Sequence, residues 1–133
     1  MAVADASTLE VLETDRVLTR LGARCGDRLD ADAAQATVAA VEQFLERMGD
    51  LPIRVLATAA VRDAEDGAAF ADQLSARIEL PVEVLSARQE GALALRAASQ
   101  CFDLTGRCAV VDIGGASTEV VIAFDGSLKD VYS

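Results

Sequence analysis

Two apolar runs separated by a Gly-Gly pair constrain the fold of this chain more than any other feature of its sequence. Residues 108–113 (CAVVDI) and 119–124 (EVVIAF) are rich in valine and isoleucine, which is typical of β-strands. Glycine accepts backbone conformations, including positive φ, that other residues avoid, so the pair between the runs predicts a reversal of the chain. Residues 112–119 (DIGGASTE) therefore predict a strand–turn–strand unit with a carboxylate at each end.

The rest of the chain predicts a single α/β domain over residues 1–133. Short apolar and polar runs up to residue 21 indicate two or three antiparallel strands, with a turn at residues 14–15. The predicted helices cover residues 30–48, 67–79 and 86–101, with a short helical turn at 60–63. The later strands are predicted at residues 53–57, 82–85, 108–113, 119–124 and 128–132, with a hairpin turn at 125–126. Such an alternation predicts layers of helices on a sheet whose middle is wound in parallel.

Residues with capping chemistry predict where two of the helices begin and where one ends. Asp32 with Gln35 can form a capping pair for the first helix, and Gly49 follows its last apolar position. Ser86 with Gln89 matches the S-x-x-Q capping box at the start of the last helix.

The composition excludes several classes of function. The 133 residues carry a formal net charge of −10 and contain no histidine, which excludes serine–histidine triads, histidine acid–base catalysis and the usual zinc ligands. An acidic chain repels nucleic acid, so no nucleic-acid partner is expected. The three cysteines (25, 101 and 108) have no C-x-x-C spacing, which predicts reduced thiols and a cytoplasmic protein. No signal stretch or membrane-length apolar run is present, so no membrane partner is expected.

The turn between the two apolar runs is suited to binding phosphate. Gly114 and Gly115 allow consecutive backbone N–H groups, with that of Ala116, to point into one concavity, and Ser117 and Thr118 can add hydroxyl donors. The stretch is not a Walker loop, since it has no G-x-x-x-x-G-K-[ST] pattern and opens a strand rather than a helix. The simpler alternative is an ordinary β-hairpin that uses the glycines only to turn.

The two acids of this unit are candidate metal ligands. Asp112 and Glu119 are brought to the same mouth by the turn and can hold Mg²⁺ directly or through water. A plain hairpin needs neither acid, which favours the functional interpretation over the structural one. A cation shared with a phosphate would also offset the negative field of the chain.

Glu90 is a candidate catalytic residue. It lies in the predicted first turn of the helix after Ser86, at the carboxyl end of the strand at 82–85, where ligands of open α/β sheets bind. A carboxylate there could align and deprotonate a water that attacks a phosphoryl group. The alternative is that it only complements the helix dipole, as acids in first turns commonly do.

Arg62 is a candidate phosphate ligand. It follows the strand at 53–57, and its planar donor fork suits phosphate oxygens. A salt bridge to Asp63 or Asp66 is an equally good interpretation from the sequence.

Three stretches resemble the exopolyphosphatase and guanosine pentaphosphate phosphohydrolase family, within the actin, hexokinase and Hsp70 superfamily. They are residues 57–64 (ATAAVRDA), 82–90 (VEVLSARQE) and 112–121 (DIGGASTEVV), of which the third is the most specific. The resemblance implies a ribonuclease H-like (actin-like ATPase) domain with a mixed sheet and helices. It also implies Mg²⁺-dependent hydrolysis of the terminal phosphoanhydride of inorganic polyphosphate or guanosine pentaphosphate.

The resemblance also assigns roles to individual positions. Glu90 matches the family's water-activating glutamate, and Arg62 matches an arginine of the cleft. Asp112 and Glu119 match its magnesium-associated acids, and residues 114–118 match its phosphate loop.

Two departures from the family pattern leave alternatives open. The family's S-G-E-E-E is S-A-R-Q-E at residues 86–90, and the family's opening strand with an A-x-D-x-G-S-N-S loop has no counterpart here. The sequence therefore predicts a partial domain that lacks the first strand and the second actin-like domain, in which exposed sheet edges would allow a homodimer. The alternatives are a catalytically impaired nucleotide- or alarmone-binding regulatory module and, less favoured by the Glu90 segment, a sugar or acetate kinase.

Overall fold

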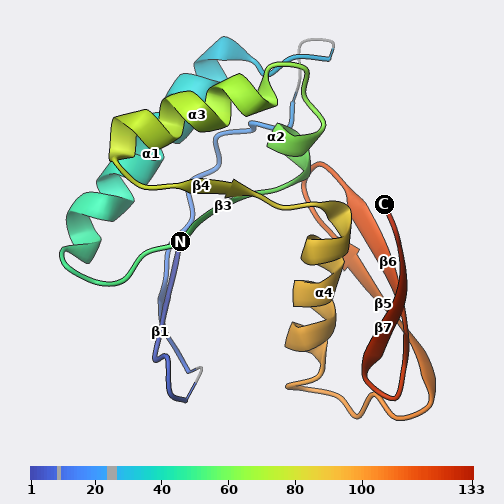
Figure 1. Cartoon of the computed structure of the whole chain (residues 1–133). Helices are drawn as coiled ribbons and strands as arrows, with labels where there is room; N and C mark the ends of the chain where they lie inside the picture. The colour runs from blue at the N-terminus through green and yellow to red at the C-terminus, as the bar shows by residue number, and fades with distance from the viewer. Residues whose placement is uncertain (9, 24–26) are drawn as a thin grey trace.

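The computed structural model describes residues 1–8, 10–23 and 27–133, and Figure 1 shows their arrangement. The helices are α1 (Ala31–Met48), α2 (Ala59–Arg62), α3 (Gly67–Ile78) and α4 (Ala87–Ala98). The strands are β1 (Ala2–Ala4), β2 (Val11–Thr14), β3 (Val55–Ala57), β4 (Val82–Val84), β5 (Arg107–Ile113), β6 (Thr118–Phe124) and β7 (Ser127–Tyr132). This order confirms the predicted α/β class.

The elements form an arch in which β3 and β4 make the crosspiece (Figure 1). Helices α1 and α3 lie side by side over one face of this pair, and the β1–β2 hairpin projects away on the opposite side. Helix α4 leaves the far end of the crosspiece and packs on the three-stranded sheet β5–β6–β7. Among the helices of the described ranges, none is long and apolar enough to cross a membrane.

The ladders among the described residues confirm the predicted mixture of parallel and antiparallel pairing. Strands β3 and β4 are parallel, as expected for the middle of the chain, with Val55 opposite Val82. Strands β5, β6 and β7 form an antiparallel meander. Because Asp112 lies directly opposite Glu119 in the β5–β6 ladder, these two side chains leave the same face of the sheet.

A groove of about 470 Å³ separates the β1–β2 and β3–β4 ladders, which are not hydrogen-bonded to each other. Residues of β1 and β3 line it, whereas residues of β2 and β4 do not, so the free edges of β1 and β3 face the same groove. The apolar face of α1 also lines it with Val41, Phe44, Leu45 and Met48.

The core beneath α4 is built from small and branched side chains. Leu95 of α4 packs with Val121 and Ala123 of β6, and both β6 residues are fully buried. Gly91 permits this close approach, because a Cβ built there would lie 2.9 Å from a γ-methyl carbon of Val131. Gly91 therefore lets the helix lie closer to the sheet than an alanine would without movement of these valine side chains.

The predicted first turn is in the wrong place. The chain reverses between residues 5 and 10, and residues 15–20 form no strand. The Asp5 side chain accepts hydrogen bonds from the backbone N–H groups of Ser7 and Thr8 and from the Ser7 hydroxyl. The Ser7 hydroxyl, followed by the Thr8 and Ser7 amides, lowers the pKa of Asp5 to about 2. This Asx-type turn forms from local side-chain chemistry that alternation of apolar residues does not reveal.

The predicted cap of α1 is also wrong, whereas that of α4 is confirmed. Asp30, not Asp32, caps α1, because its side chain accepts the Ala33 N–H at 2.9 Å. Gly49 ends the helix with φ 56°, as predicted. The run at 53–57 forms a strand only at 55–57, and Leu56 is 43% exposed rather than buried. The prediction of a reduced thiol at position 25 lies outside the described residues; Cys101 and Cys108 are free thiols.

Candidate functional site

A hollow of about 480 Å³ lies where three distant segments of the chain meet. Its walls are residues 17–23, the segment 58–60 that begins α2, and the turn at 114–117, with Glu90 of α4 beside them. A larger groove of about 710 Å³ between α1 and α3 contains none of the predicted site residues. The smaller hollow is therefore the candidate site.

Local chemistry at the start of α4 places Glu90 in the hollow. Ser86 and Gln89 form the predicted capping box: the Gln89 N–H donates to Ser86 Oγ, and the Ser86 N–H donates to Gln89 Oε1 at 2.9 Å. This fixes the first turn of the helix, in which Glu90 is the acidic residue. Its side chain is 16% exposed.

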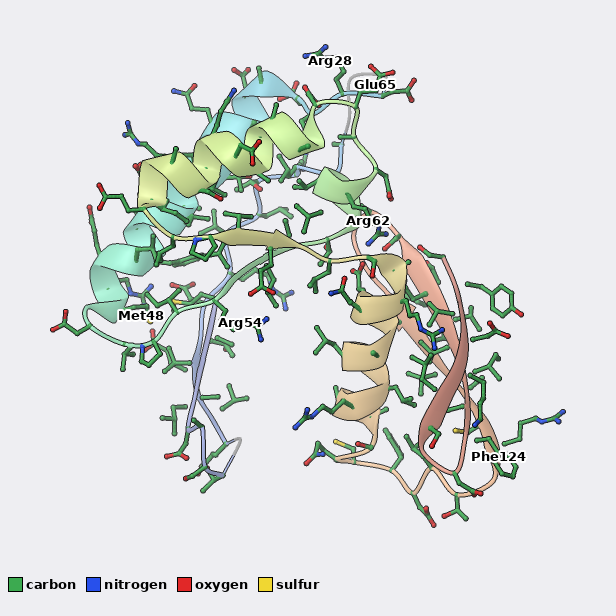
Figure 2. The ribbon with its side chains drawn as sticks, in the orientation of Figure 1. Arg28, Met48, Arg54, Arg62, Glu65 and Phe124 are labelled. Atoms are coloured by element: carbon green, nitrogen blue, oxygen red, sulfur yellow. The ribbon has the colours of Figure 1, made fainter. Side chains whose placement is uncertain are left out.

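Arg62 lies between α2 and the beginning of α4, as Figure 2 shows, and pairs with Glu90. Its Nη1 donates to Glu90 Oε2 at 2.7 Å and to the Leu85 carbonyl at 3.1 Å, and its Nε donates to Asp63 Oδ1 at 3.0 Å. Burial lowers the pKa of Arg62, but the hydrogen bonds to Glu90 and Asp63 outweigh it and leave the pKa above its ordinary value. The salt-bridge interpretation is thus correct for Asp63, while Asp66 pairs with Arg28 instead.

The pairing leaves one oxygen of Glu90 open. Oε2 is held by Arg62, whereas Oε1 accepts no hydrogen bond from any residue that the structure describes. A carboxylate held on one oxygen is oriented, and Glu90 lines the hollow with its other oxygen free of any donor among the described residues. Such an arrangement can accept a hydrogen bond from a water or a ligand.

The turn at 114–117 presents backbone donors. The Gly114 N–H donates to the Ser117 carbonyl at 3.0 Å and closes the turn. The N–H groups of Gly115, Ala116 and Ser117 donate to no residue within the described ranges. Gly114 and Gly115 do not use the positive φ that glycine permits, since the described glycines with positive φ are residues 49, 106 and 126. What the pair provides is space: a Cβ built on Gly115 would meet nothing within 4 Å.

The two predicted metal ligands differ in environment. Glu119 is 1% exposed; its Oε1 accepts the Ser133 hydroxyl at 3.0 Å, and its buried Oε2 has no partner among the described residues. Asp112 is exposed on the same face of the ladder. Neither residue lines the hollow.

Magnesium fits this acidic pair only in part. A buried carboxylate oxygen without a donor is rare and marks an interaction still to be made, for example with a cation. The described residues contain no group of three His, Cys, Asp or Glu side chains placed to share one ion. Asp112 and Glu119 could therefore hold Mg²⁺ only together with oxygens of water or phosphate, which is how Mg²⁺ is commonly bound.

The structure divides the predicted site residues into two groups. Glu90 and residues 114–117 line the hollow, and Arg62 reaches it through Glu90. Thr118 is the first residue of β6, paired with Ile113, and does not line it.

The sequence did not predict that residues 17–23 line the hollow. Residues 17–23 and Thr58 line it, although they lie far from residues 114–117 in the sequence. Gly22 touches the turn closely, because a Cβ built on it would lie 2.9 Å from Ala116 Cβ. The only signal in the sequence was the break that Gly22 makes in the apolar pattern, which does not reveal a partner.

Comparison with solved structures defines the class of protein. An exopolyphosphatase-like protein is 27% identical with a TM-score of 0.81, and a member of the Ppx/GppA family from Aquifex aeolicus is 26% identical with a TM-score of 0.77. Each comparison covers 98% of this chain and 44% of the other. An exopolyphosphatase from Cytophaga hutchinsonii has the same fold, with a TM-score of 0.82 at 18% identity. The predicted ribonuclease H-like, actin-like fold is thereby confirmed.

The chain belongs to the Ppx/GppA phosphatase family, whose model matches residues 2–133. It is 35% identical over 97 residues to the guanosine-5'-triphosphate,3'-diphosphate pyrophosphatases of Vibrio parahaemolyticus and of Vibrio cholerae. The matched region is 71% of this chain but only 20% of those relatives. The chain thus matches about a fifth of the length of these proteins.

Proposed function

We propose that this chain binds the terminal phosphates of inorganic polyphosphate or guanosine pentaphosphate and takes part in Mg²⁺-dependent hydrolysis of the terminal phosphoanhydride. The observation that carries the proposal is the meeting of an oriented carboxylate and a donor-rich turn in one hollow. Glu90 lines it from one side and the N–H groups of residues 115–117 from the other. The names of the family and of its relatives support phosphate chemistry of this kind.

The turn is the proposed phosphate ligand. Three successive N–H groups without a described acceptor can donate to the oxygens of a phosphoryl group. The absent side chain at Gly115 leaves room for those oxygens to approach the backbone. Donors fixed in this way stabilise the negative charge that develops on phosphoryl oxygens during transfer.

Glu90 is the proposed water-aligning residue. Arg62 holds Oε2 at 2.7 Å, which leaves Oε1 to accept a hydrogen bond from the attacking water and then its proton. Arg62 thus acts through Glu90 as an orienting residue, and phosphate contact by Arg62 would require its hydrogen bonds to Asp63 or Glu90 to be exchanged.

Asp112 and Glu119 do not line the hollow, but their ladder pair is adjacent to the Ile113–Thr118 pair from which the turn begins, and Mg²⁺ held there would neutralise charge on a phosphate at the turn. The unpartnered buried Oε2 of Glu119 supports this role. The Ser133 hydroxyl donates a hydrogen bond to the other oxygen of this carboxylate, Oε1. A cation that bound both oxygens would have to displace this hydrogen bond.

The test is phosphate release from tripolyphosphate in the presence of Mg²⁺. We expect Glu90→Gln to lower the rate at least about 100-fold, the usual range for loss of a general base, while tripolyphosphate still raises the melting temperature. Glu46→Gln, at an exposed position of α1, is the control with the same change in charge. A rate for Glu90→Gln equal to that of Glu46→Gln would rule out the proposed role.

The second candidate is a binding module without turnover. The first turn of α4 supports it. Gln89 is used in the capping box, which leaves Glu90 as the acidic residue of this turn, and that acid alone can complement the helix dipole without a catalytic role. Stabilisation by tripolyphosphate without any phosphate release would favour this candidate over hydrolysis.

A further inference from the structure

Residues 17–23, which line the hollow, contact both α1 and the turn at 114–117. In residues 17–23, the Ala23 N–H donates to the Arg20 carbonyl at 2.8 Å and closes a turn. The hydroxyls of Thr19 and Thr37 are 2.8 Å apart and tie this turn to α1, while Gly22 contacts Ala116. The turn at residues 20–23 is therefore packed against the turn at residues 114–117.

Arg20 occupies a strained position in this turn. Its φ is 57°, in the left-handed region that residues other than glycine, asparagine and aspartate rarely adopt. Strained residues persist only where the surrounding contacts hold them, and they are concentrated at ligand sites. Here the contacts of Thr19 and Gly22 on either side hold the backbone in place.

The charge of the hollow points to a role for this residue. Among the described residues that line it, Arg20 and Glu90 are the charged ones. Arg20 is exposed and makes no ion pair within the described part of the chain, whereas Arg62 is held by Asp63 and Glu90. The chain has a net charge of −10, so its overall electrostatic potential repels anions. Arg20 places a positive charge at the hollow, where that repulsion is reduced locally.

We propose that Arg20 forms a second subsite, which binds the next phosphate of a linear phosphate chain whose terminal phosphate lies against residues 115–117. The proposal rests on the proposed function, since it assumes that the turn holds a phosphate. A single phosphate is satisfied by the N–H groups of the turn, but a chain of phosphates carries further charge that those donors do not reach. The guanidinium fork suits that charge, and it selects ligands with at least two successive phosphates.

The test compares binding of tripolyphosphate and orthophosphate by titration calorimetry with Mg²⁺ present. We expect Arg20→Gln to weaken tripolyphosphate binding about tenfold and to leave orthophosphate binding unchanged. Arg96→Gln, at an exposed position of α4 that does not line the hollow, controls for the change in net charge. Equal losses of tripolyphosphate affinity in the two variants would overturn the subsite, because they would show that only the net charge of the chain matters.

A second variant separates binding from folding. Arg20→Gly relieves the positive φ, so we expect an equal or higher melting temperature together with weaker tripolyphosphate binding. A lower melting temperature with unchanged binding would assign Arg20 a purely structural role and overturn the proposal.

The outcomes also distinguish this subsite from the proposed function. If the chain binds tripolyphosphate through Arg20 but releases no phosphate, hydrolysis fails and the subsite stands. If phosphate is released normally and Arg20→Gln binds tripolyphosphate as tightly as the unchanged chain, the subsite fails and hydrolysis stands. Absence of tripolyphosphate binding by the unchanged chain would overturn both.

Discussion

The two sides of the hollow are built in opposite ways. On one side, Arg62 and Glu90 form an ion pair at 2.7 Å that is more than four-fifths buried and is supported by Asp63 and the Leu85 carbonyl. On the other side, the turn at 114–117 leaves three N–H groups without described partners. The paired side is organised without a ligand, whereas under the proposed function the open side would be completed by a bound phosphate.

This difference separates stability from binding. A substitution on the paired side disturbs contacts that already exist, so it should change the free energy of unfolding. If the proposed function holds, a substitution on the open side removes contacts that only a ligand makes, so it should change affinity while the fold is unaffected. Four predictions test this separation, beginning with the largest effect.

The largest effect is expected at Gly67, which lets α3 approach α2. A Cβ built on Gly67 would lie 1.7 Å from the Val61 carbonyl oxygen, so the backbone next to Arg62 would have to move. We expect Gly67→Ala to lower the free energy of unfolding by about 3 kcal/mol, measured by urea denaturation. Gly91→Ala is the control: its Cβ would lie 2.9 Å and 3.0 Å from γ-methyl carbons of Val131 and 3.0 Å from one of Val121, which are side-chain and not backbone atoms, and alanine favours a helix, so the loss should be smaller, about 1 kcal/mol. Equal losses would mean that the backbone at Val61 yields easily.

The ion pair itself should contribute somewhat less. Arg62→Met leaves the largely buried Glu90 without its donor, and we expect a loss of about 2 kcal/mol in the free energy of unfolding. Adding Glu90→Gln should recover part of that loss, because a neutral amide no longer needs the cation. The double-mutant cycle measures this coupling; strictly additive losses would show that the two residues act independently.

The open side should respond in affinity alone. Gly115→Ala adds a methyl group that meets no protein atom within 4 Å, so the melting temperature should be unchanged while tripolyphosphate affinity falls about tenfold. Gly114→Ala differs, since its Cβ would lie 3.3 Å from the Ser117 carbonyl oxygen and should lower both quantities slightly. If Gly115→Ala lowered the melting temperature without affecting affinity, the turn would be a structural hairpin.

The smallest effect concerns pH and Asp66, the residue that precedes α3. The Leu29 N–H, 2.9 Å from Asp66 Oδ1, lowers the pKa of Asp66, with Arg28 adding to this. A lowered pKa in the folded state stabilises the fold above the unfolded value of about 4, and this contribution disappears as the pH falls below it. The difference in melting temperature between the unchanged chain and Asp66→Asn should therefore narrow below about pH 4. A constant difference from pH 7 to pH 3 would contradict the assigned cause.

Much of the fold follows from local patterns. The period of the apolar residues located α1 and α3, and the capping box at Ser86 fixed the beginning of α4 correctly. The errors came where side chains bond to nearby backbone: the Asp5 turn displaced the predicted turn, and Asp30 replaced Asp32 as the cap of α1. Several residues in each segment could form such bonds, and the sequence does not show which geometry is reached.

The sequence predicted most residues of the candidate site but not how they are arranged in space. Glu90 and the turn at 114–117 do share a hollow, yet the predicted acids Asp112 and Glu119 lie outside its lining. The pairing of Arg62 with Glu90 was not foreseen, because these residues are separated by a helix and a strand. Arg20 had no signal in the sequence at all.

The sequence by itself determined the elements and the chemical character of the turn, because helix periodicity, capping and the Gly-Gly pair act over a few residues. It also determined the family, since the three motifs are local strings. Among the described residues, only the tertiary structure decided which donors of the turn have no acceptor, which carboxylate is buried and which arginine lines the hollow. Those properties depend on packing between segments far apart in the chain, as the contact between Gly22 and Ala116 shows.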